Sequence, residues 1–299
     1  MADWHRISVI GSDRSSESVA EVFTALGASS VTFTDAADQP LYEPPLDSHP
    51  LWHQTRIVAL FENPVELEAV RESVSNALPG AALGNWNLEI LADRVWEREW
   101  MDHFKPMQFG KRLRVYPSHQ PPPDPAAVNL LLDPGLAFGT GAHPTTALCL
   151  EWLADNDLHE LRIMDYGCGS GILAVAAILL GAINAIAVDI DEQALMATAA
   201  NALNNGVVDR IICRFPAQIV NETVDIVIAN ILAKPLEELA PVLSGCVVPG
   251  GKLVLSGFFV EQIDAILDAY RDFIFAPPAI RENWVRLDGN KETRLYHRI

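Results

Sequence analysis

Residues 163–173 read Ile163-Met164-Asp165-Tyr166-Gly167-Cys168-Gly169-Ser170-Gly171-Ile172-Leu173, and this stretch decides the fold. An apolar strand runs into three alternating glycines, and an apolar helix follows them. Glycines permit both a tight turn and the close approach of a ligand to the backbone, which a Cβ atom would block. The stretch therefore predicts a strand, a turn and a helix of an α/β sheet that binds a ligand at the turn.

The spacing of the glycines narrows the class of ligand. A dinucleotide-binding turn has a third glycine where this chain has Ile172, and Asp165 precedes the turn. This pattern departs from the NAD form and matches the methyltransferase form. Asp189 lies at the end of the next predicted strand, where a carboxylate can accept hydrogen bonds from both hydroxyls of a ribose. A phosphate-binding or purely structural glycine turn is the alternative.

Apolar strands and helices alternate along the C-terminal two thirds of the chain. They begin beyond a stiff proline-rich loop at 120–125. The strands are expected at 163–165, 185–189, 224–230 and 252–256. Such repetition predicts a parallel sheet covered on both faces. At the tail, Asp288-Gly289-Asn290 predicts the turn of an antiparallel hairpin between 284–287 and 293–297.

Residues 1–92 follow a different pattern. Strands are expected at 5–12, 30–36, 56–61 and 87–91, and helices at 16–26 and 65–78. The order strand, helix, strand, strand, helix, strand predicts a small ferredoxin-like α+β domain. Trp96, Trp100 and Phe104 then recur every four residues, which predicts a linker helix at 93–106. The α/β domain would span 107–299.

A glycine-rich segment lies upstream of the glycine turn. It reads Asp133-Pro134-Gly135-Leu136-Ala137-Phe138-Gly139-Thr140-Gly141-Ala142-His143-Pro144-Thr145-Thr146. So many glycines, hydroxyls and apolar residues together predict a mobile lid over a ligand, with an inter-domain hinge as the alternative. His143 has no metal partner at ligand spacing, so a structural or hydrogen-bonding role is expected and no metal site is predicted.

Asn230 ends the predicted strand 224–230. Ligands of open α/β sheets bind at the carboxyl ends of strands, so Asn230 is expected beside the ligand. Its amide could accept a hydrogen bond from an incoming amine without favouring the protonated amine, as a carboxylate would. An asparagine that only satisfies the backbone is the alternative.

Composition limits the partners and the compartment. A net charge of −18 argues against a phosphate-backbone binder and favours a basic partner. The four cysteines form no C-x-x-C pair, which suggests neither a zinc site nor disulfides and fits the cytoplasm. The apolar run 172–188 contains Gly181 and Asn184, so we expect a helix that ends at a glycine and then a buried strand rather than a membrane span.

Three motifs together resemble those of a known family. They are Phe138-Gly139-Thr140-Gly141-Ala142-His143-Pro144-Thr145-Thr146, Asp165-Tyr166-Gly167-Cys168-Gly169-Ser170-Gly171 and Asn230-Ile231-Leu232-Ala233. The chain resembles the methyltransferases that modify large-subunit ribosomal protein eleven (PrmA type), and the likeness extends along its whole length. Tyr166 and Ala142 stand where that pattern would have Phe and Thr, and neither side chain is expected to be essential.

The resemblance implies a fold and a set of roles. A Rossmann-like class I methyltransferase domain with a mostly parallel seven-stranded sheet would follow the ferredoxin-like domain. The N-terminal domain would bind the basic ribosomal protein, and the C-terminal domain would transfer methyl groups from S-adenosylmethionine to its α-amine and lysine ε-amines. Asn230 would be catalytic. The residues in contact with the cofactor would be Thr146, Gly167, Asp189, Asn230, Gly169, Phe138 and Thr140.

Other functions are less well supported. A methyltransferase that acts on another protein or on a small-molecule amine is the main alternative. The acidic charge disfavours a nucleic-acid substrate. A non-catalytic assembly factor could keep the same fold, but the intact glycines, Asp189 and Asn230 speak against it.

Overall fold

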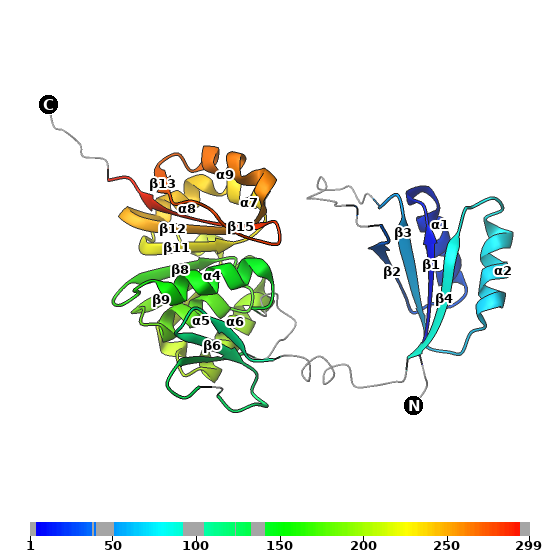
Figure 1. Cartoon of the computed structure of the whole chain (residues 1–299), viewed down its shortest axis with the longest axis horizontal. Coiled ribbons are helices and arrows are strands. Elements are labelled where there is room, and N and C mark those ends of the chain that lie inside the picture. Colours follow the sequence, from blue (N-terminus) through cyan, green and yellow to red (C-terminus); the bar gives the residue numbers. More distant parts are fainter. Residues whose placement is uncertain are drawn as a thin grey trace. The chain divides into compact units, whose positions relative to one another are not determined.

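The computed structural model describes residues 4–37, 39, 51–91, 105–122, 124–132 and 141–293 (Figure 1). The chain divides into two compact units, Met1–Trp96 and Glu97–Ile299. Each unit has its own hydrophobic core. Within these described ranges, no helix has both the length and the apolar character needed to cross a membrane.

The N-terminal unit is one antiparallel sheet with two helices on one face. Its elements are β1 (Trp4–Gly11), α1 (Asp13–Ala25), β2 (Ser30–Asp35), β3 (Thr55–Phe61), α2 (Leu67–Ala77) and β4 (Gly84–Leu91). The strand order is β2-β3-β1-β4, and every neighbouring pair is antiparallel. Val9 and Ile57 of the sheet pack with Phe23 of α1 and Val74 of α2. The expected elements are therefore present, with ends that differ by a few residues.

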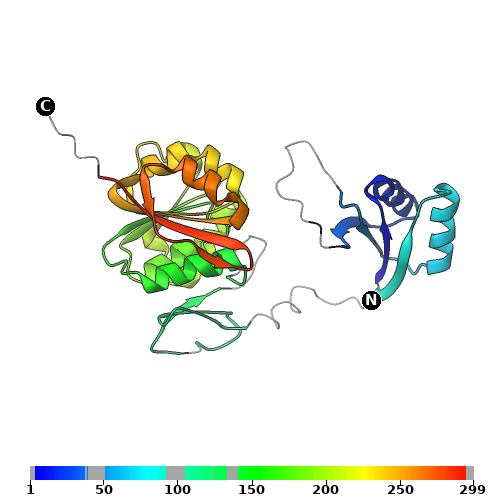
Figure 2. The same ribbon diagram turned by 45° about the horizontal axis from the view of Figure 1, so that its top comes forward.

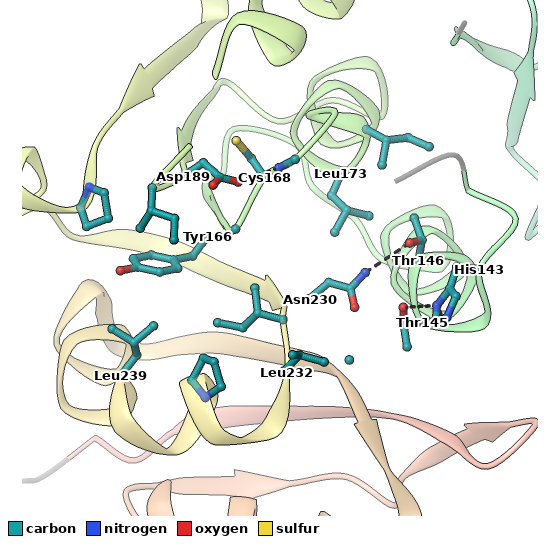
Figure 3. Close-up of a pocket in the computed structure, with 18 of the residues that line it drawn as sticks. His143, Thr145, Thr146, Tyr166, Cys168, Leu173, Asp189, Asn230, Leu232 and Leu239 are labelled. Atoms are coloured by element: carbon teal, nitrogen blue, oxygen red, sulfur yellow. Dashed lines mark hydrogen bonds between the residues drawn. The ribbon is translucent and has the colours of Figure 1, made fainter. Parts of the chain in front are cut away.

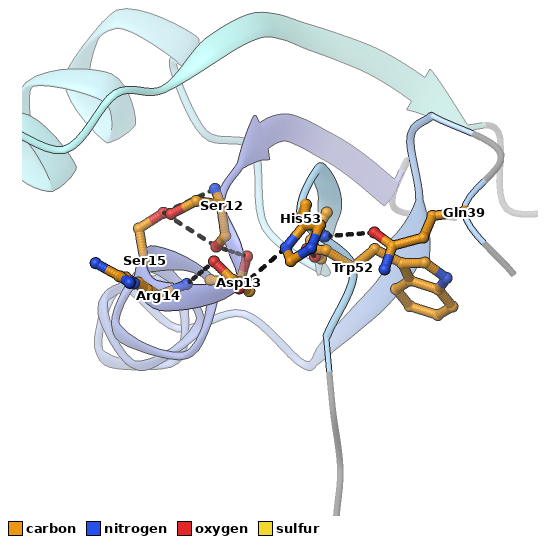
Figure 4. Close-up of polar contacts among 9 residues, drawn as sticks. Ser12, Asp13, Arg14, Ser15, Gln39, Trp52 and His53 are labelled. Atoms are coloured by element: carbon orange, nitrogen blue, oxygen red, sulfur yellow. Dashed lines mark hydrogen bonds and ion pairs between the residues drawn. The ribbon is translucent and has the colours of Figure 1, made fainter. Parts of the chain in front are cut away.

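Polar contacts hold the start of α1 against a neighbouring loop (Figure 4). The Ser12 N–H donates to Ser15 Oγ at 3.0 Å. His53 Nδ1 lies 3.3 Å from Asp13 Oδ2, and the His53 N–H donates to Gln39 Oε1 at 2.9 Å. The two His53 contacts are exposed and tie the segment that leads into β3 to Asp13 and Gln39, although each contributes little stability in water.

The main sheet of the C-terminal unit has eight strands. Their order is β10-β9-β8-β11-β12-β15-β13, and β14 pairs with β15 off this path. The strands are β8 (Arg162–Tyr166), β9 (Asn184–Val188), β10 (Ile211–Arg214), β11 (Val224–Asn230), β12 (Val247–Phe259), β13 (Phe273–Phe275), β14 (Ala279–Arg281) and β15 (Trp284–Lys291). Each neighbouring pair along β10-β9-β8-β11-β12 is parallel. Strands β12, β13 and β14 each pair antiparallel with β15. The sheet is thus mixed, with one strand more than the seven expected.

Helices cover both faces of this sheet (Figure 2). They are α4 (Pro144–Asp155), α5 (Ile172–Leu179), α6 (Glu192–Asn204), α7 (Ala233–Glu238), α8 (Ala240–Cys246) and α9 (Ile263–Ala269). Successive residues of β11 point to opposite faces of the sheet. Ile228 belongs to the core that contains α4 and α5, and Val227 belongs to the core that contains α7 and α8. The expectation of a sheet covered on both faces is confirmed, as is the helix ending near Gly181 (φ +120°) before the buried β9.

A second, three-stranded sheet belongs to the same unit. It contains β5 (Met107–Phe109), β6 (Leu113–Tyr116) and β7 (Val128–Leu131) in that order. Leu113, Val115 and Leu130 are fully buried and join the core that contains α4 and α5. The strands β5 to β7 are therefore part of the core of the C-terminal unit rather than of a connecting segment.

The prediction of a turn at Asp288-Gly289-Asn290 is wrong. These residues lie inside β15, where Gly289 pairs with Leu253 and Phe275. The Phe275 ring covers Gly289, and a Cβ added there would meet Phe275 Cδ1 at 2.7 Å. This glycine makes room for a ring instead of forming a turn. Residues 294–297 of the expected partner strand lie outside the described residues.

The hairpin turn lies one element earlier in the chain. Strands β14 and β15 are joined by Glu282 and Asn283, whose φ angles are 50° and 68°. Two consecutive positive φ angles are typical of a tight two-residue hairpin. Glutamate is unusual at such a position, so the sequence carried no glycine signal for this turn.

Candidate active site

A cavity of about 730 Å³ opens at the carboxyl ends of the parallel strands (Figure 3). Its walls come from the glycine turn after β8, from the ends of β9 and β11, and from the first turn of α4. The volume falls in the range of roughly 300–1,000 Å³ that is typical of small-molecule sites. Among the predicted site residues, those on its walls are Thr146, Gly167, Gly169, Asp189 and Asn230.

The glycine turn is required by both backbone conformation and packing. Gly167, Gly169 and Gly171 all have positive φ angles, of 76°, 52° and 75°. A Cβ on Gly167 would lie 2.3 Å from Ile231 Cγ2, and one on Gly171 would lie 2.6 Å from Thr198 Cγ2. The turn is fixed because the N–H groups of Gly167 and Cys168 both donate to the Val188 carbonyl.

Asp189 connects the glycine turn to the next helix. Its Oδ2 accepts from the Gly169 N–H at 2.9 Å, and its Oδ1 accepts from the Asp191 N–H at 3.0 Å. Asp191 in turn caps α6 by accepting from the Gln193 N–H at 2.9 Å. Each carboxylate oxygen has two acceptor positions, so these bonds leave Asp189 able to accept two more hydrogen bonds at the cavity wall.

Asn230 and Thr146 come from different elements and are hydrogen-bonded to each other at the cavity wall. Asn230 ends β11, and its Nδ2 donates to Oγ1 of Thr146 in the first turn of α4 at 3.2 Å. Thr146 is buried. Because the amide nitrogen is engaged in this way, Asn230 presents its Oδ1 as an acceptor. Asn230 lies between Asp189 on one side and His143 on the other (Figure 3).

Two glycines hold the segment that carries Asn230. Ile231 contacts Gly167 on one side, and its backbone contacts Gly257 of β12 on the other. Gly257 has a φ of +100°, and a Cβ there would come within 2.2 Å of the Ile231 carbonyl oxygen. Gly257 was not predicted to support the site, although a glycine inside a strand often indicates close backbone approach.

His143 has a structural role and also lines the cavity. Its Nδ1 lies 2.7 Å from Thr145 Oγ1 and accepts from the Thr145 N–H at the start of α4. Burial lowers the pKa of His143 below its usual value, and Glu282 opposes this effect. The expected hydrogen-bonding histidine is confirmed. Trp284, whose ring lies 4.8 Å from the His143 ring, was missed as a cavity residue.

Asp165 lies buried beneath the glycine turn. Its Oδ2 accepts from the Ala174 N–H at 3.1 Å, while no described residue donates to its buried Oδ1. Burial raises the pKa of Asp165 from 3.8 to about 7; the Ala174 bond opposes the shift and Asp189 adds to it. The acid therefore carries a proton over much of the acidic range.

Several residues with predicted roles lie outside the described residues. Phe138 and Thr140, two predicted cofactor contacts, lie outside the described residues, as do residues 93–104 of the predicted linker helix. The described part of the chain contains no group of three or more His, Cys, Asp or Glu side chains that could hold a metal ion.

A family model described as ribosomal protein L11 methyltransferase (PrmA) matches residues 3–292. The chain belongs to this family. This PrmA-family chain is 50% identical to the ribosomal protein L11 methyltransferase of Methylococcus capsulatus, over 97% of this chain and 100% of that protein. It is also 50% identical to the protein of the same name from Nitrosococcus oceani, over 92% of this chain and 94% of the other. The resemblance drawn from the motifs is confirmed.

A solved structure supports the α/β methyltransferase fold of this PrmA-family chain. The crystal structure of ribosomal protein L11 methylase from Lactobacillus delbrueckii subsp. bulgaricus is 30% identical, with a TM-score of 0.58. The match covers 63% of this chain and 100% of the other.

Proposed function

We propose that this chain methylates amines of ribosomal protein L11, namely lysine ε-amines and the N-terminal α-amine, with S-adenosylmethionine as the methyl donor. Its family and its relatives carry the name ribosomal protein L11 methyltransferase. The observation that carries the proposal is that the glycine turn, Asp189 and Asn230 line one cavity. Transfer to another protein or to a small-molecule amine is the alternative, and the family match disfavours it.

The residues of the cavity fit the proposed cofactor. Asp189 would accept from the ribose hydroxyls, because its backbone bonds leave two acceptor positions. The backbone of Gly167 and Gly169 would pass close to the ligand, and Thr146 and Asn230 would contact its reacting end. Phe138 and Thr140 remain predicted contacts from the lid motif.

The chemistry requires alignment and a neutral amine. S-adenosylmethionine supplies a methyl group whose C–S bond breaks, with its electron pair going to sulfur, as the amine lone pair forms the C–N bond. A lysine amine with a pKa near 10.4 is neutral in about one molecule in a few thousand at pH 7, which costs roughly 4–5 kcal/mol. The apolar cavity walls would favour the neutral amine by desolvation. Asn230 Oδ1 would orient the amine through a hydrogen bond without attracting the proton as a carboxylate does.

We further propose that the N-terminal domain, residues 1–92, is ferredoxin-like and recognises the substrate. The order β2-β3-β1-β4 with two helices on one face supports this assignment. The linker at 93–106 and the catalytic domain at 107–299 complete the proposed organisation, which lies close to the division at 96/97. The net charge of −18 favours a basic partner, and four free cysteines are consistent with the cytoplasm.

The test is methylation of purified ribosomal protein L11. We expect mass spectrometry to show methyl groups on lysine and α-amino nitrogens after incubation with the chain and S-adenosylmethionine. A parallel calorimetric titration measures binding of S-adenosylmethionine. Binding without any methylation of L11 would refute the substrate assignment, and the absence of binding would refute the cofactor assignment.

A further inference from the structure

Two aromatic side chains, His143 and Trp284, line the cavity and, together with Phe259, which packs against Trp284, are here called the aromatic wall. Trp284 and His143 line the cavity with their rings 4.8 Å apart and inclined at 69°. Phe259 packs against Trp284 with ring centroids 3.9 Å apart and an interplanar angle of 32°. His143 lies on the opposite side of Asn230 from Asp189 (Figure 3). The aromatic wall is thus at the far end of the cavity from the proposed ribose acceptor.

The β14–β15 hairpin, which carries Trp284, is tied to α4 from both of its strands. Arg281 Nη2 donates to both carboxylate oxygens of Glu151, at 2.9 and 3.0 Å. Arg286 Nη1 donates to the Leu148 carbonyl at 3.0 Å. Both acceptors belong to α4, whose first turn carries Thr146. Trp284 is therefore held in place before any ligand binds, which lowers the entropy cost of using it as a contact.

The chemistry of the aromatic wall fits an alkyl ammonium group. Tryptophan is the side chain whose face best attracts a cation, by about 0.5–2 kcal/mol depending on desolvation. It also packs well against methylene groups, and the lysine stem can bury these while its charged end stays polar. Unlike a carboxylate, an aromatic ring does not accept the proton that the amine must release. The described cavity walls include no Lys or Arg that would repel the incoming cation.

We propose that Trp284 determines specificity by binding the lysine stem and ammonium group of the acceptor before methyl transfer. This inference rests on the proposed function and adds a residue to it. The ammonium group first reaches the aromatic wall, its proton passes to water, and the neutral amine then lies at Asn230 Oδ1. An α-amine has no four-carbon stem to lay along the ring. Trp284 should thus matter more for lysine than for the α-amine.

The test compares Trp284→Leu and Trp284→Phe in the full-length chain with L11 as acceptor. We expect Trp284→Leu to lower kcat/KM for lysine methylation by roughly two- to thirtyfold, the range of a lost cation–π contact. The rate at the α-amine should fall less, and Trp284→Phe should restore most of the lysine rate. Calorimetric affinity for S-adenosylmethionine should stay unchanged in both variants.

Ile280→Ala is the matched control, because Ile280 is exposed and lies on the same hairpin. It should leave lysine methylation and the melting temperature unchanged. An unchanged lysine rate in Trp284→Leu would overturn the inference, as would equal losses at both amines or a loss of cofactor affinity that explains the whole effect. Failure of the wild-type chain to methylate L11 would instead overturn the proposed function, so the two failures are distinguishable.

Discussion

At the scale of single residues, Asp189 both stabilises the glycine turn and offers acceptor positions to a ligand. It receives backbone bonds from the glycine turn and from Asp191, and it keeps acceptor positions at the cavity wall. We expect Asp189→Ala to weaken binding of S-adenosylmethionine by about 1.5–3 kcal/mol, measured by calorimetry, because charged hydrogen bonds are lost. Asp191→Ala is the control: it removes the cap of α6, so it should cost about 1 kcal/mol of stability with little change in affinity. Unchanged affinity in Asp189→Ala would place the ribose elsewhere.

Asp165 predicts a pH dependence of stability. Between about pH 4 and pH 7 the unfolded chain loses the proton of this carboxyl group while the folded chain keeps it, because burial raises the folded pKa from 3.8 to about 7. The folded state binds more protons there, so this group lowers the free energy of unfolding as the pH rises, by up to about 1.4 kcal/mol per pH unit. Below about pH 4 this carboxyl group is protonated in both states and does not change the free energy of unfolding. Above about pH 7 it is ionised in both states, and its destabilising contribution no longer changes with pH.

Urea unfolding of the wild type and Asp165→Asn across this range measures the contribution. The difference in stability between them should shift in favour of the variant as the pH rises, since asparagine does not titrate. A difference that is independent of pH would contradict the buried, protonated acid.

Asn230 should affect the reaction rate more than cofactor binding. Its Oδ1 is an acceptor beside the proposed position of the reacting methyl group, and loss of one positioned contact commonly costs about a hundredfold in rate. Single-turnover rates of Asn230→Ala should fall accordingly, while affinity for S-adenosylmethionine changes less. Asn230→Asp should also fail near pH 7, because a carboxylate favours the protonated amine, and it should recover as the pH approaches 10. Rates near the wild-type value in Asn230→Ala would assign the positioning to other groups.

Where the sequence signal was local, the residues predicted for the site line one cavity. The glycines, Asp189 and Asn230 follow strand ends, and parallel strands bring their carboxyl ends to one edge of a sheet. Trp284 had no such signal, because it reaches the cavity through an antiparallel strand. Its neighbour His143 lies far away in the sequence.

At the scale of elements, the segment after β11 is held between two glycines. We expect Gly257→Ala to destabilise the chain by more than 1 kcal/mol and to lower the methylation rate, because the new Cβ would displace the Ile231 backbone and with it Asn230. Gly250→Ala is a matched control in the same strand: Gly250 also has a positive φ, of +78°, but its nearest neighbour lies 3.6 Å away. Thermal unfolding and initial rates of both variants separate backbone strain from contact. Equal effects on rate would contradict the positioning role.

Element prediction was reliable for periodic segments and poor at turns. Strands β8, β9, β11 and β12 were expected close to where they lie, because long apolar runs and flanking helices are local features, whereas the parallel edge strand β10 was not expected. The turn at Asp288-Gly289-Asn290 was expected from its composition alone. The Phe275 ring that explains Gly289 comes from another strand, so only the three-dimensional packing could reveal it. Strands β5 to β7 are short and had no periodic signal.

At the scale of the whole molecule, the cavity and its supports lie in the C-terminal unit. We expect a fragment that begins at Lys105 to bind S-adenosylmethionine with near wild-type affinity and to lose methylation of L11. It keeps β5 to β7, whose buried side chains complete the core beside α5. Calorimetry measures the first property and mass spectrometry of L11 the second. A thermal melt should confirm cooperative folding, and full methylation by this fragment would exclude a substrate-binding role for residues 1–92.

The position of β15 also orders the assembly of the molecule during its synthesis. Translation delivers the chain from its N terminus, and domains fold as units as they emerge. The N-terminal sheet is complete once β4 has appeared, since all its partners precede it. The sheet of the C-terminal unit is likewise completed by its last strand, because β15 lies between β12 and β13, both of which are made earlier. A nascent chain would thus make its glycine turn well before Trp284, so the aromatic wall would form only after the rest of the cavity had been synthesised.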